Sequence, residues 1–174
     1  MDQPFRIRSL SRIEAREAAP ALAAVLGDCV AGGASVSFMA DMTPADAEAF
    51  WREETAADDG RAVLVAEDAA GIFGVVQVIP AWPPNQPHRA DISKLLVHRR
   101  GRRRGAAEAL MVAAEAAAQA MGRWLMTLDT VTGGSAERLY EKLGWTRAGV
   151  IADYALMPDG ELSATTVFYK ALGR

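Results

Sequence analysis

The spacing of apolar and polar residues changes along the chain, and it predicts where strands and helices lie. Apolar and polar residues alternate over Phe5–Leu10, which predicts a half-buried strand because successive side chains of a strand point to opposite faces. From Glu14 to Val30 the apolar residues recur three and four positions apart, and this spacing predicts one helix with a buried face. The pair Gly32-Gly33 follows directly and is expected to end that helix.

A second helix is predicted to begin at Thr43. The Thr43 hydroxyl can cap the first turn, and Pro44 suits the first helical position because that position needs no N–H donor. Phe50 and Trp51 belong to the apolar face that follows, and Asp58–Gly60 has the composition of a closing turn. Two helices are therefore expected before the main run of strands.

The rest of the chain is predicted to form strands with two helices between them. The short segment Asp68–Gly71 joins two strands as a hairpin, and the prolines between Pro80 and Pro87 prevent the second of these strands from continuing. The predicted order is β-α-α-β-β-β-α-β-α-β-β, an α/β sandwich with a mixed central sheet rather than a regular βαβ alternation. The expected strands are Arg61–Glu67, Ile72–Ile79, Ala90–Val97, Trp124–Thr130, Trp145–Tyr154 and Leu162–Tyr169, and the expected helices are Arg102–Met121 and Ser135–Leu143.

Length, charge and cysteine content narrow the class of protein. A chain of 174 residues is expected to be one domain, residues 1–174. The 19 Lys and Arg residues against 22 Asp and Glu residues give a formal net charge of −3, so no overall field draws the protein to nucleic acid or to an anionic membrane. No apolar run approaches the roughly 18 residues of a membrane span, and the first residues lack the apolar stretch of a secretory signal. The single Cys29 cannot form an internal disulfide, and no paired cysteines indicate a metal site, so we expect a cytoplasmic protein without a metal.

The most informative segment follows the strand that ends at Leu95-Leu96-Val97. It contains five arginines and two glycines within Arg99–Gly105, here called the arginine turn, and a predicted helix begins at its end. The first turn of a helix has about four N–H groups without intrahelical partners, and the helix dipole adds positive potential there. Gly105 and the small Ala107 allow close approach, and arginines supply donors to phosphate oxygens. The segment therefore has the composition of an anion site.

Three interpretations of the arginine turn compete. It can be a solvated basic turn, since runs of charge usually face water. It can contact nucleic acid, which the negative net charge and the absence of interleaved aromatic residues disfavour. It can bind a phosphate-bearing cofactor, but neither the Gly-Lys-Ser/Thr of a nucleotide P-loop nor the G-x-G-x-x-G of a dinucleotide fold is present.

A family resemblance supports the third interpretation, a phosphate-bearing cofactor. The six residues Arg102, Arg103, Arg104, Gly105, Ala106 and Ala107 resemble the R/Q-x-x-G-x-G/A signature of the GCN5-related N-acetyltransferases, the GNAT family. The segment Ala136–Trp145 is similar to the family's A-x-x-L-Y-x-x-x-G-F motif, with Trp145 in place of Phe. The resemblance implies the GNAT-like α/β sandwich and acetyl-coenzyme A as co-substrate. It also implies that the arginine turn cradles the pyrophosphate while the backbone of Leu95, Leu96 and Val97 meets the pantetheine arm.

Tyr140 and Asp129 are the candidate catalytic residues. The family often uses a tyrosine at the position of Tyr140 as general acid, and a phenol titrating near 10 can donate or share a proton with a thiolate near 8.5. The alternative is a core tyrosine that packs its helix on the sheet. Asp129 ends a strand, where a carboxylate can act as base, hold the substrate amine, or cap the amides of Thr132 or Gly133.

The acceptor is expected to be a small amine. His88–Ala90 and the last third of the chain resemble the tabtoxin-resistance type of acetyltransferase, which implies N-acetylation of an amino-acid-like molecule. Direct attack in a ternary complex is expected, because the cofactor can be attacked without an acyl-enzyme when both substrates are held together. The candidate acceptor-site residues are Trp82, Asp91, Asp153 and Tyr154. A homodimer is plausible because symmetric dimers are the commonest oligomers. The rival from another class is a non-catalytic acyl-coenzyme A-binding or sensing module.

Two positions depart from the family pattern. Arg103 stands where glycine is common, so we expect the turn to accept a side chain with negative φ. Gly133 stands where many members have an asparagine that supports cofactor binding, which puts that contact in doubt.

Overall fold

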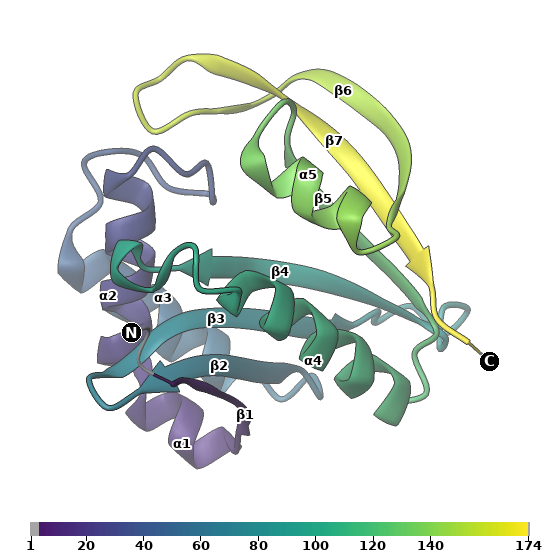
Figure 1. Cartoon of the computed structure of the whole chain (residues 1–174), viewed down its shortest axis with the longest axis horizontal. Coiled ribbons are helices and arrows are strands. Elements are labelled where there is room, and N and C mark those ends of the chain that lie inside the picture. The colour runs from purple at the N-terminus through teal and green to yellow at the C-terminus, as the bar shows by residue number, and fades with distance from the viewer. Residues whose placement is uncertain (1–3, 174) are drawn as a thin grey trace.

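The computed structural model describes residues 4–173, and in this range one seven-stranded sheet carries helices on both faces (Figure 1). The strand order is β1-β2-β3-β4-β5-β7-β6, so the predicted mixed-sheet α/β fold is confirmed. The elements are β1 (Arg6–Leu10), α1 (Arg12–Glu17), α2 (Ala19–Ala31), α3 (Pro44–Ala56), β2 (Ala62–Asp68), β3 (Gly71–Pro80), β4 (Arg89–Val97), the 3₁₀ turn η1 (Arg99–Gly101), α4 (Ala106–Ala120), β5 (Leu125–Val131), α5 (Ser135–Lys142), β6 (Thr146–Leu156) and β7 (Leu162–Ala171). No helix in the described part of the chain is long and apolar enough to cross a membrane.

The single helix expected over Glu14–Val30 is wrong, because the chain forms two helices there. α1 begins with a capping box at Ser11 and ends at Glu17, and α2 begins at Ala19. The cause is Pro20, which has no N–H to donate and whose ring clashes with a helical carbonyl four residues earlier. Proline is tolerated in the first turn of α2, so a new helix starts around it.

The long helix also begins later than Arg102. α4 starts at Ala106 because Arg103 and Gly105 adopt left-handed φ values of 62° and 79°, which no α-helix includes. The expectation of a negative φ at Arg103 is therefore wrong. The chain must turn sharply between η1 and α4, and Arg103 takes the conformation for which glycine is usually chosen.

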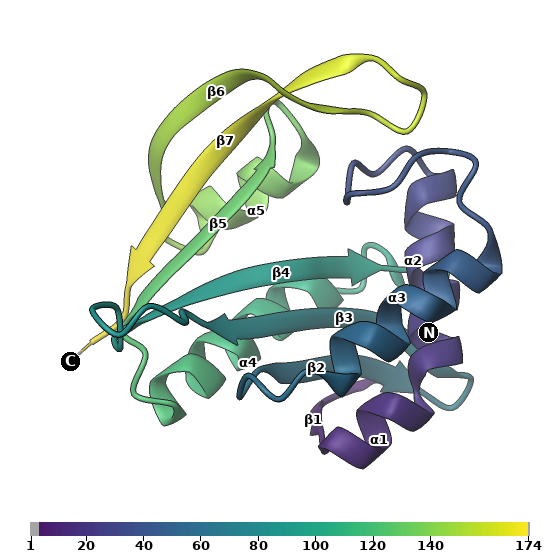
Figure 2. The same ribbon diagram turned by 180° about the vertical axis from the view of Figure 1, so that it is seen from behind.

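Two apolar cores hold the sheet between its helices (Figure 2). On one face α4 buries Leu110 and Met111 against the sheet. On the other face α2 and α3 bury Leu22, Leu26 and Trp51. The half of the sheet formed by β1–β4 is therefore covered on both sides, as expected for a sandwich of this class.

β4 and β5 share only a short ladder and then diverge. Three parallel pairs join them, from Arg89–Asp91 to Leu125–Thr127. β5 then pairs with β7 over its whole length, and Figures 1 and 2 show it leaving β4 at an angle. The far half of β4, Ile92–Val97, consequently has an open backbone edge.

A β-bulge interrupts the pairing of β4 with β3. Val75 pairs with Leu96 and Gln77 pairs with Ser93, so β4 has one residue more than β3 between these pairs. Lys94 lies within this bulge with a φ of 52°, in the left-handed region. A bulge increases the local twist and redirects a side chain.

Candidate functional site

A cleft of about 1090 Å³ lies where β4 and β5 diverge. The floor comes from the second half of β4, and the walls come from the arginine turn, the start of α4, the end of β5 and α5. The loop between α2 and α3 closes the remaining side against the β6–β7 hairpin. Ser35 Oγ donates to the Leu156 carbonyl at 3.0 Å, and the Ala40 N–H donates to the Pro158 carbonyl at 3.0 Å.

The start of α4 presents backbone donors to this cleft. The helix has no side-chain cap, and within the described residues nothing accepts a hydrogen bond from the N–H groups of Ala106, Ala107 and Glu108. A Cβ built on Gly105 would meet no heavy atom within 4 Å, so the space over the turn is open. Free amides at the positive end of a 15-residue helix, with open space above them, fit a pyrophosphate group.

Three of the five arginines are bound by carboxylates of the chain itself. Arg99 is paired with Asp28 on α2, and its N–H donates to the same carboxylate at 2.7 Å. Arg100 and Arg104 both bind Asp68, at 2.9 and 3.0 Å. These hydrogen bonds hold the pKa of Asp68 at about 2. Three of the five predicted phosphate donors thus have carboxylate partners that fix the turn to α2 and to the β2–β3 hairpin.

The remaining two arginines line the cleft. Arg102 is exposed, and its Nε donates to the Val97 carbonyl at 3.3 Å. Arg103 is exposed, and no carboxylate of the described residues pairs with it. The backbone conformation that Arg103 adopts thus leaves one guanidinium available to an anion.

The open edge of β4 exposes alternate peptide groups. The His98 N–H donates to the Phe73 carbonyl at 2.8 Å, so the N–H of His98 points toward β3. By the alternation of an antiparallel pair, the peptide N–H of Leu96 faces β3, whereas that of Val97 faces the cleft. Leu95 lies in the bulge, where this alternation is interrupted, and it lines the cleft, and Leu96 contributes a buried core side chain.

Tyr140 is both a packed core residue and part of the cleft lining. Its ring is buried, with only 5% of the residue exposed, and packs against Trp145 and Phe168 at centroid distances of 5.9 and 5.8 Å. The residue also lines the cleft, and no group of the described residues forms a hydrogen bond with its hydroxyl. Burial, with a smaller contribution from the negative charge of Asp129, raises the pKa of Tyr140 to about 12. The phenol therefore keeps its proton at neutral pH.

Asp129 is exposed at the end of β5 and lines the same cleft. Its carboxylate accepts a hydrogen bond of 2.8 Å from the Thr165 hydroxyl. The Thr132 N–H donates to the Ala164 carbonyl and the Gly133 N–H to the Glu137 carboxylate. Both amides that Asp129 was expected to be able to cap are thus bound elsewhere, which leaves the base and anchor roles.

The four predicted acceptor-site residues do not gather. Tyr154 lines the cleft, whereas Trp82 is 89% exposed in the proline loop and lies outside the lining. Asp91 also lies outside it and is bound to Arg89 and to the Thr127 hydroxyl at the closed end of the sheet. Asp153 adopts a φ of 51° in an irregular part of β6 and does not line the cleft.

Other residues occupy the acceptor side of the cleft. Lys94, Ser37 and Phe38 line it, and no periodic pattern in the sequence marks these three positions. Lys94 continues an ordinary strand pattern in the sequence, and Ser37 and Phe38 lie in a loop without a motif. Their position depends on the bulge and on the contact of the loop with the β6–β7 hairpin. Within the described residues no three His, Cys, Asp or Glu side chains gather as a metal site.

Comparisons with known proteins agree with this geometry. Solved structures with the same fold include an N-acetyltransferase from Staphylococcus aureus Mu50, at a TM-score of 0.81 and 17% identity over 98% of this chain and all of the other. A protein from Salmonella typhimurium, assigned provisionally as an acetyltransferase and solved with its cofactor acetyl-CoA, has a TM-score of 0.79 and 17% identity over 99% and 96%. A provisional phosphinothricin N-acetyltransferase has a TM-score of 0.81 and 19% identity over 98% and 100%. The family model described as Acetyltransferase (GNAT) domain matches residues 59–147, just over half of the chain. This match shows that the chain belongs to the GNAT family of acetyltransferases, the acetyl-coenzyme A-dependent acyltransferases.

Proposed function

We propose that the protein, as one domain over residues 1–174, transfers the acetyl group of acetyl-coenzyme A to the amine of a small, amino-acid-like molecule. The observation that carries the proposal is the meeting of three features in one cleft: the free amides of α4, the open edge of β4 and the unbound hydroxyl of Tyr140. The cofactor supplies an activated thioester carbonyl. Both substrates fit in one cleft, which supports direct attack without a covalent intermediate on the protein.

The residues of the cleft support each part of this transfer. A peptide N–H of Leu95 or Val97 polarises the thioester carbonyl. The exposed carboxylate of Asp129 holds the incoming ammonium, and an exposed carboxylate suits this role better than abstraction of the proton, which water can accept. The amine attacks the carbonyl carbon, the C–S bond breaks, and the thiolate leaves with the electron pair beside Tyr140.

The raised pKa defines what Tyr140 does. A phenol with a pKa of about 12 lies about 3.5 units above a free thiol, so complete proton transfer to the thiolate is uphill by about 5 kcal/mol. A hydrogen bond from a neutral phenol to the developing thiolate has no such cost and is strengthened by the buried surroundings. We therefore assign Tyr140 the role of a donor that shares its proton with the leaving sulfur.

The test is release of free thiol from acetyl-coenzyme A against a panel of amines, with Tyr140→Phe compared with Tyr169→Phe. Tyr169 lies on β7 outside the cleft lining and is 40% exposed, so it is a matched control. Tyr140→Phe is expected to lower kcat by about 100-fold at unchanged KM for acetyl-coenzyme A, and Tyr169→Phe is expected to act as wild type. A wild-type rate in Tyr140→Phe would overturn the assignment.

The rival function is an acyl-coenzyme A-binding module without catalysis. It predicts that the protein binds acetyl-coenzyme A by calorimetry while no amine of the panel releases thiol. The unbound Tyr140 hydroxyl favours the catalytic proposal, since a sensing module has no need of a donor beside the thioester sulfur.

The proposal extends to the surroundings of the protein. Three of the five arginines are paired with carboxylates of the chain, which supports the absence of a nucleic-acid partner. We propose a cytoplasmic location without membrane contact, which fits a lone buried thiol at Cys29. A homodimer through β6 is supported by its exposed apolar side chains, including Val150 and Ile151. Analytical ultracentrifugation distinguishes the monomer from the dimer.

A further inference from the structure

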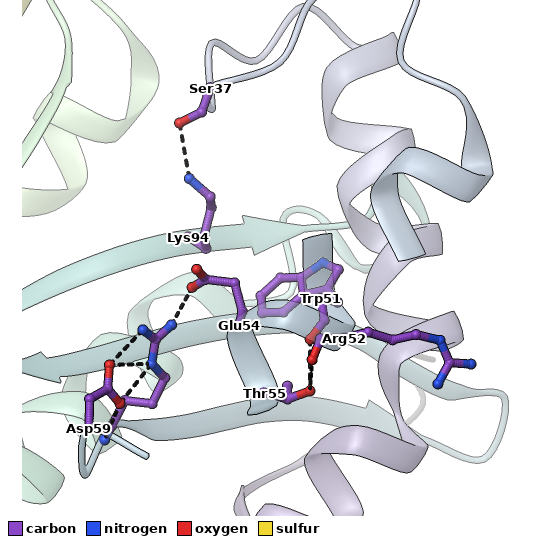
Figure 3. Close-up of polar contacts among 8 residues, drawn as sticks. Ser37, Trp51, Arg52, Glu54, Thr55, Asp59 and Lys94 are labelled. Atoms are coloured by element: carbon purple, nitrogen blue, oxygen red, sulfur yellow. Dashed lines mark hydrogen bonds and ion pairs between the residues drawn. The ribbon is translucent and has the colours of Figure 1, made fainter. Parts of the chain in front are cut away.

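Lys94 is placed in the cleft by an unusual backbone. It lies in the bulge of β4 with a φ of 52°, and it contacts Ser37, whose φ is 78°. Residues other than glycine seldom adopt positive φ, and such strain concentrates at functional sites. Two strained residues from distant segments thus meet at one wall of the cleft, as Figure 3 shows.

The Lys94 ammonium has only uncharged partners. Its Nζ donates to Ser37 Oγ at 3.2 Å and lies 5.4 Å from the centroid of the Phe50 ring. No carboxylate of the described residues lies within ion-pair distance of it. Glu54, the nearby acid on α3 (Figure 3), is bound to Arg61 instead. Arg99, in contrast, has a carboxylate partner within the chain.

The surroundings of Lys94 favour an anion from outside the chain. Burial lowers the pKa of Lys94, and the negative charges of Glu54 and Asp129 oppose this shift. A half-buried cation that has lost water and has gained no counter-ion binds an incoming carboxylate more strongly than an exposed lysine does.

Asp129 supplies the opposite charge on the other wall. It lies on β5, and Lys94 lies on β4, and the two strands diverge at this point. The two side chains line the same cleft without forming an ion pair, so a small molecule fits between them. Phe38, packed edge-to-face on Phe50 at 5.1 Å, gives this part of the cleft an apolar surface for the body of the ligand.

We propose that Lys94 binds the carboxylate of a zwitterionic acceptor whose amino group is held by Asp129 beside the open edge of β4. This inference rests on the proposed function and names its substrate class: small molecules that carry both an amine and a carboxylate. Lys94 is the residue that distinguishes them from plain amines. Ser37 orients the lysine through its hydrogen bond.

The experiment compares each amino acid of a panel with its own carboxamide as acceptor, at saturating acetyl-coenzyme A. The ratio of the two kcat/KM values is measured for wild type, Lys94→Met, Lys94→Arg and Lys94→Gly. Differences in intrinsic amine reactivity cancel when the ratio is compared between variants. Lys94→Met is expected to reduce the preference for the carboxylate form by about 10- to 100-fold, mainly through KM. Lys94→Arg is expected to retain most of it.

Lys94→Gly and a control variant show whether the change in preference comes from the lost charge or from a disturbed backbone. Lys94→Gly relieves the positive φ and also removes the charge, so it is expected to fold as well as wild type and to lose the same preference. Arg52→Met is the control, because Arg52 is an exposed cation on α3 whose partner is Glu48. It is expected to leave both kcat/KM values unchanged.

Each result has a distinct meaning. Equal loss for amino acids and carboxamides in Lys94→Met would overturn the carboxylate role while acetyl transfer stands. Acetylation of carboxamides but of no amino acid would also overturn it. Failure of every acceptor to release thiol, with acetyl-coenzyme A still bound, would instead contradict the proposed function itself.

Discussion

The arginine turn and the acceptor wall line one cleft, but they come from different parts of the chain. The arginine turn offers backbone N–H groups from one continuous segment that runs into α4. The name acceptor wall is used here for Ser37 and Lys94 on one side of the cleft together with Asp129 on the other, and these residues offer side chains from three segments far apart in sequence. Binding by the arginine turn therefore depends on backbone geometry, whereas binding by the acceptor wall depends on the chemistry of its side chains. Substitutions can test this contrast directly.

The largest effect is expected for Gly101→Ala in the arginine turn. A Cβ at Gly101 would lie 3.0 Å from Cγ of the buried Phe73 ring and closer still to its edge. The ring is packed in the core and cannot give way, so η1 must shift. We expect a loss of unfolding free energy of about 3 kcal/mol in urea and greatly weakened binding of coenzyme A in calorimetry.

Gly149→Ala is the control for this prediction, because a Cβ there meets nothing within 4 Å. It is expected to change neither quantity by a measurable amount. If Gly101→Ala were as stable as wild type, contact between a side chain at position 101 and the Phe73 ring would not be what limits the position of η1.

The second effect compares two arginines of the same turn. Arg103 lines the cleft and has no carboxylate partner among residues 4–173, whereas Arg99 is bound to Asp28. Arg103→Asn keeps a residue that tolerates positive φ and removes the charge. It is expected to raise the KM for acetyl-coenzyme A by about 5- to 10-fold, and Arg99→Gln by less than about 2-fold. The reverse order would mean that the ion pairs open when the cofactor binds.

The third prediction concerns the pH dependence of the turn. Arg100 and Arg104 lower the pKa of Asp68 to about 2 from an ordinary value near 4. The stabilisation from this carboxylate is therefore fully present above about pH 4 and is lost as the pH falls toward 2. Asp68→Asn is expected to lower the unfolding free energy at neutral pH, and its difference from wild type is expected to vanish near pH 2. Urea unfolding of both proteins from pH 2 to pH 7 measures this. A difference that stays constant with pH would rule out the ion pairs as its cause.

The smallest effect is a gain in stability outside both walls. Gly27 lies in α2 with open space around it, and its φ is not positive. Gly27→Ala is expected to stabilise the protein by about 0.5–1 kcal/mol, because alanine loses less backbone freedom on folding. Thermal unfolding measures it. A loss instead would show that glycine sites in this fold are sensitive in general, which would weaken the interpretation of Gly101→Ala.

The arginine turn could be located from the amino-acid sequence, because the residues that form it are consecutive. The segment consists of a strand, then a basic turn with glycines, then the start of a helix. The spacing of apolar residues and the composition of the turn therefore indicated an anion site there. The order of strands and helices followed from the same local rules, and Pro20 was itself a local signal for the break between α1 and α2. Tyr140 was identified because the motif around it resembles that of a known family.

Which charges remain available in the arginine turn, and which residues form the acceptor wall, depends on contacts between distant segments of the folded chain. The partners of Arg99 and Arg100 lie 71 and 32 positions away in sequence, and no spacing rule pairs them. Lys94 enters the cleft because β4 is bulged against β3 while β5 diverges, and Asp129 faces it from the other side of that gap. The register between β3 and β4 and the divergence of β5 from β4 are properties of the whole sheet, and both depend on how its two faces are packed. For this reason the donor half of the site could be predicted from consecutive residues, and the acceptor half required the folded chain.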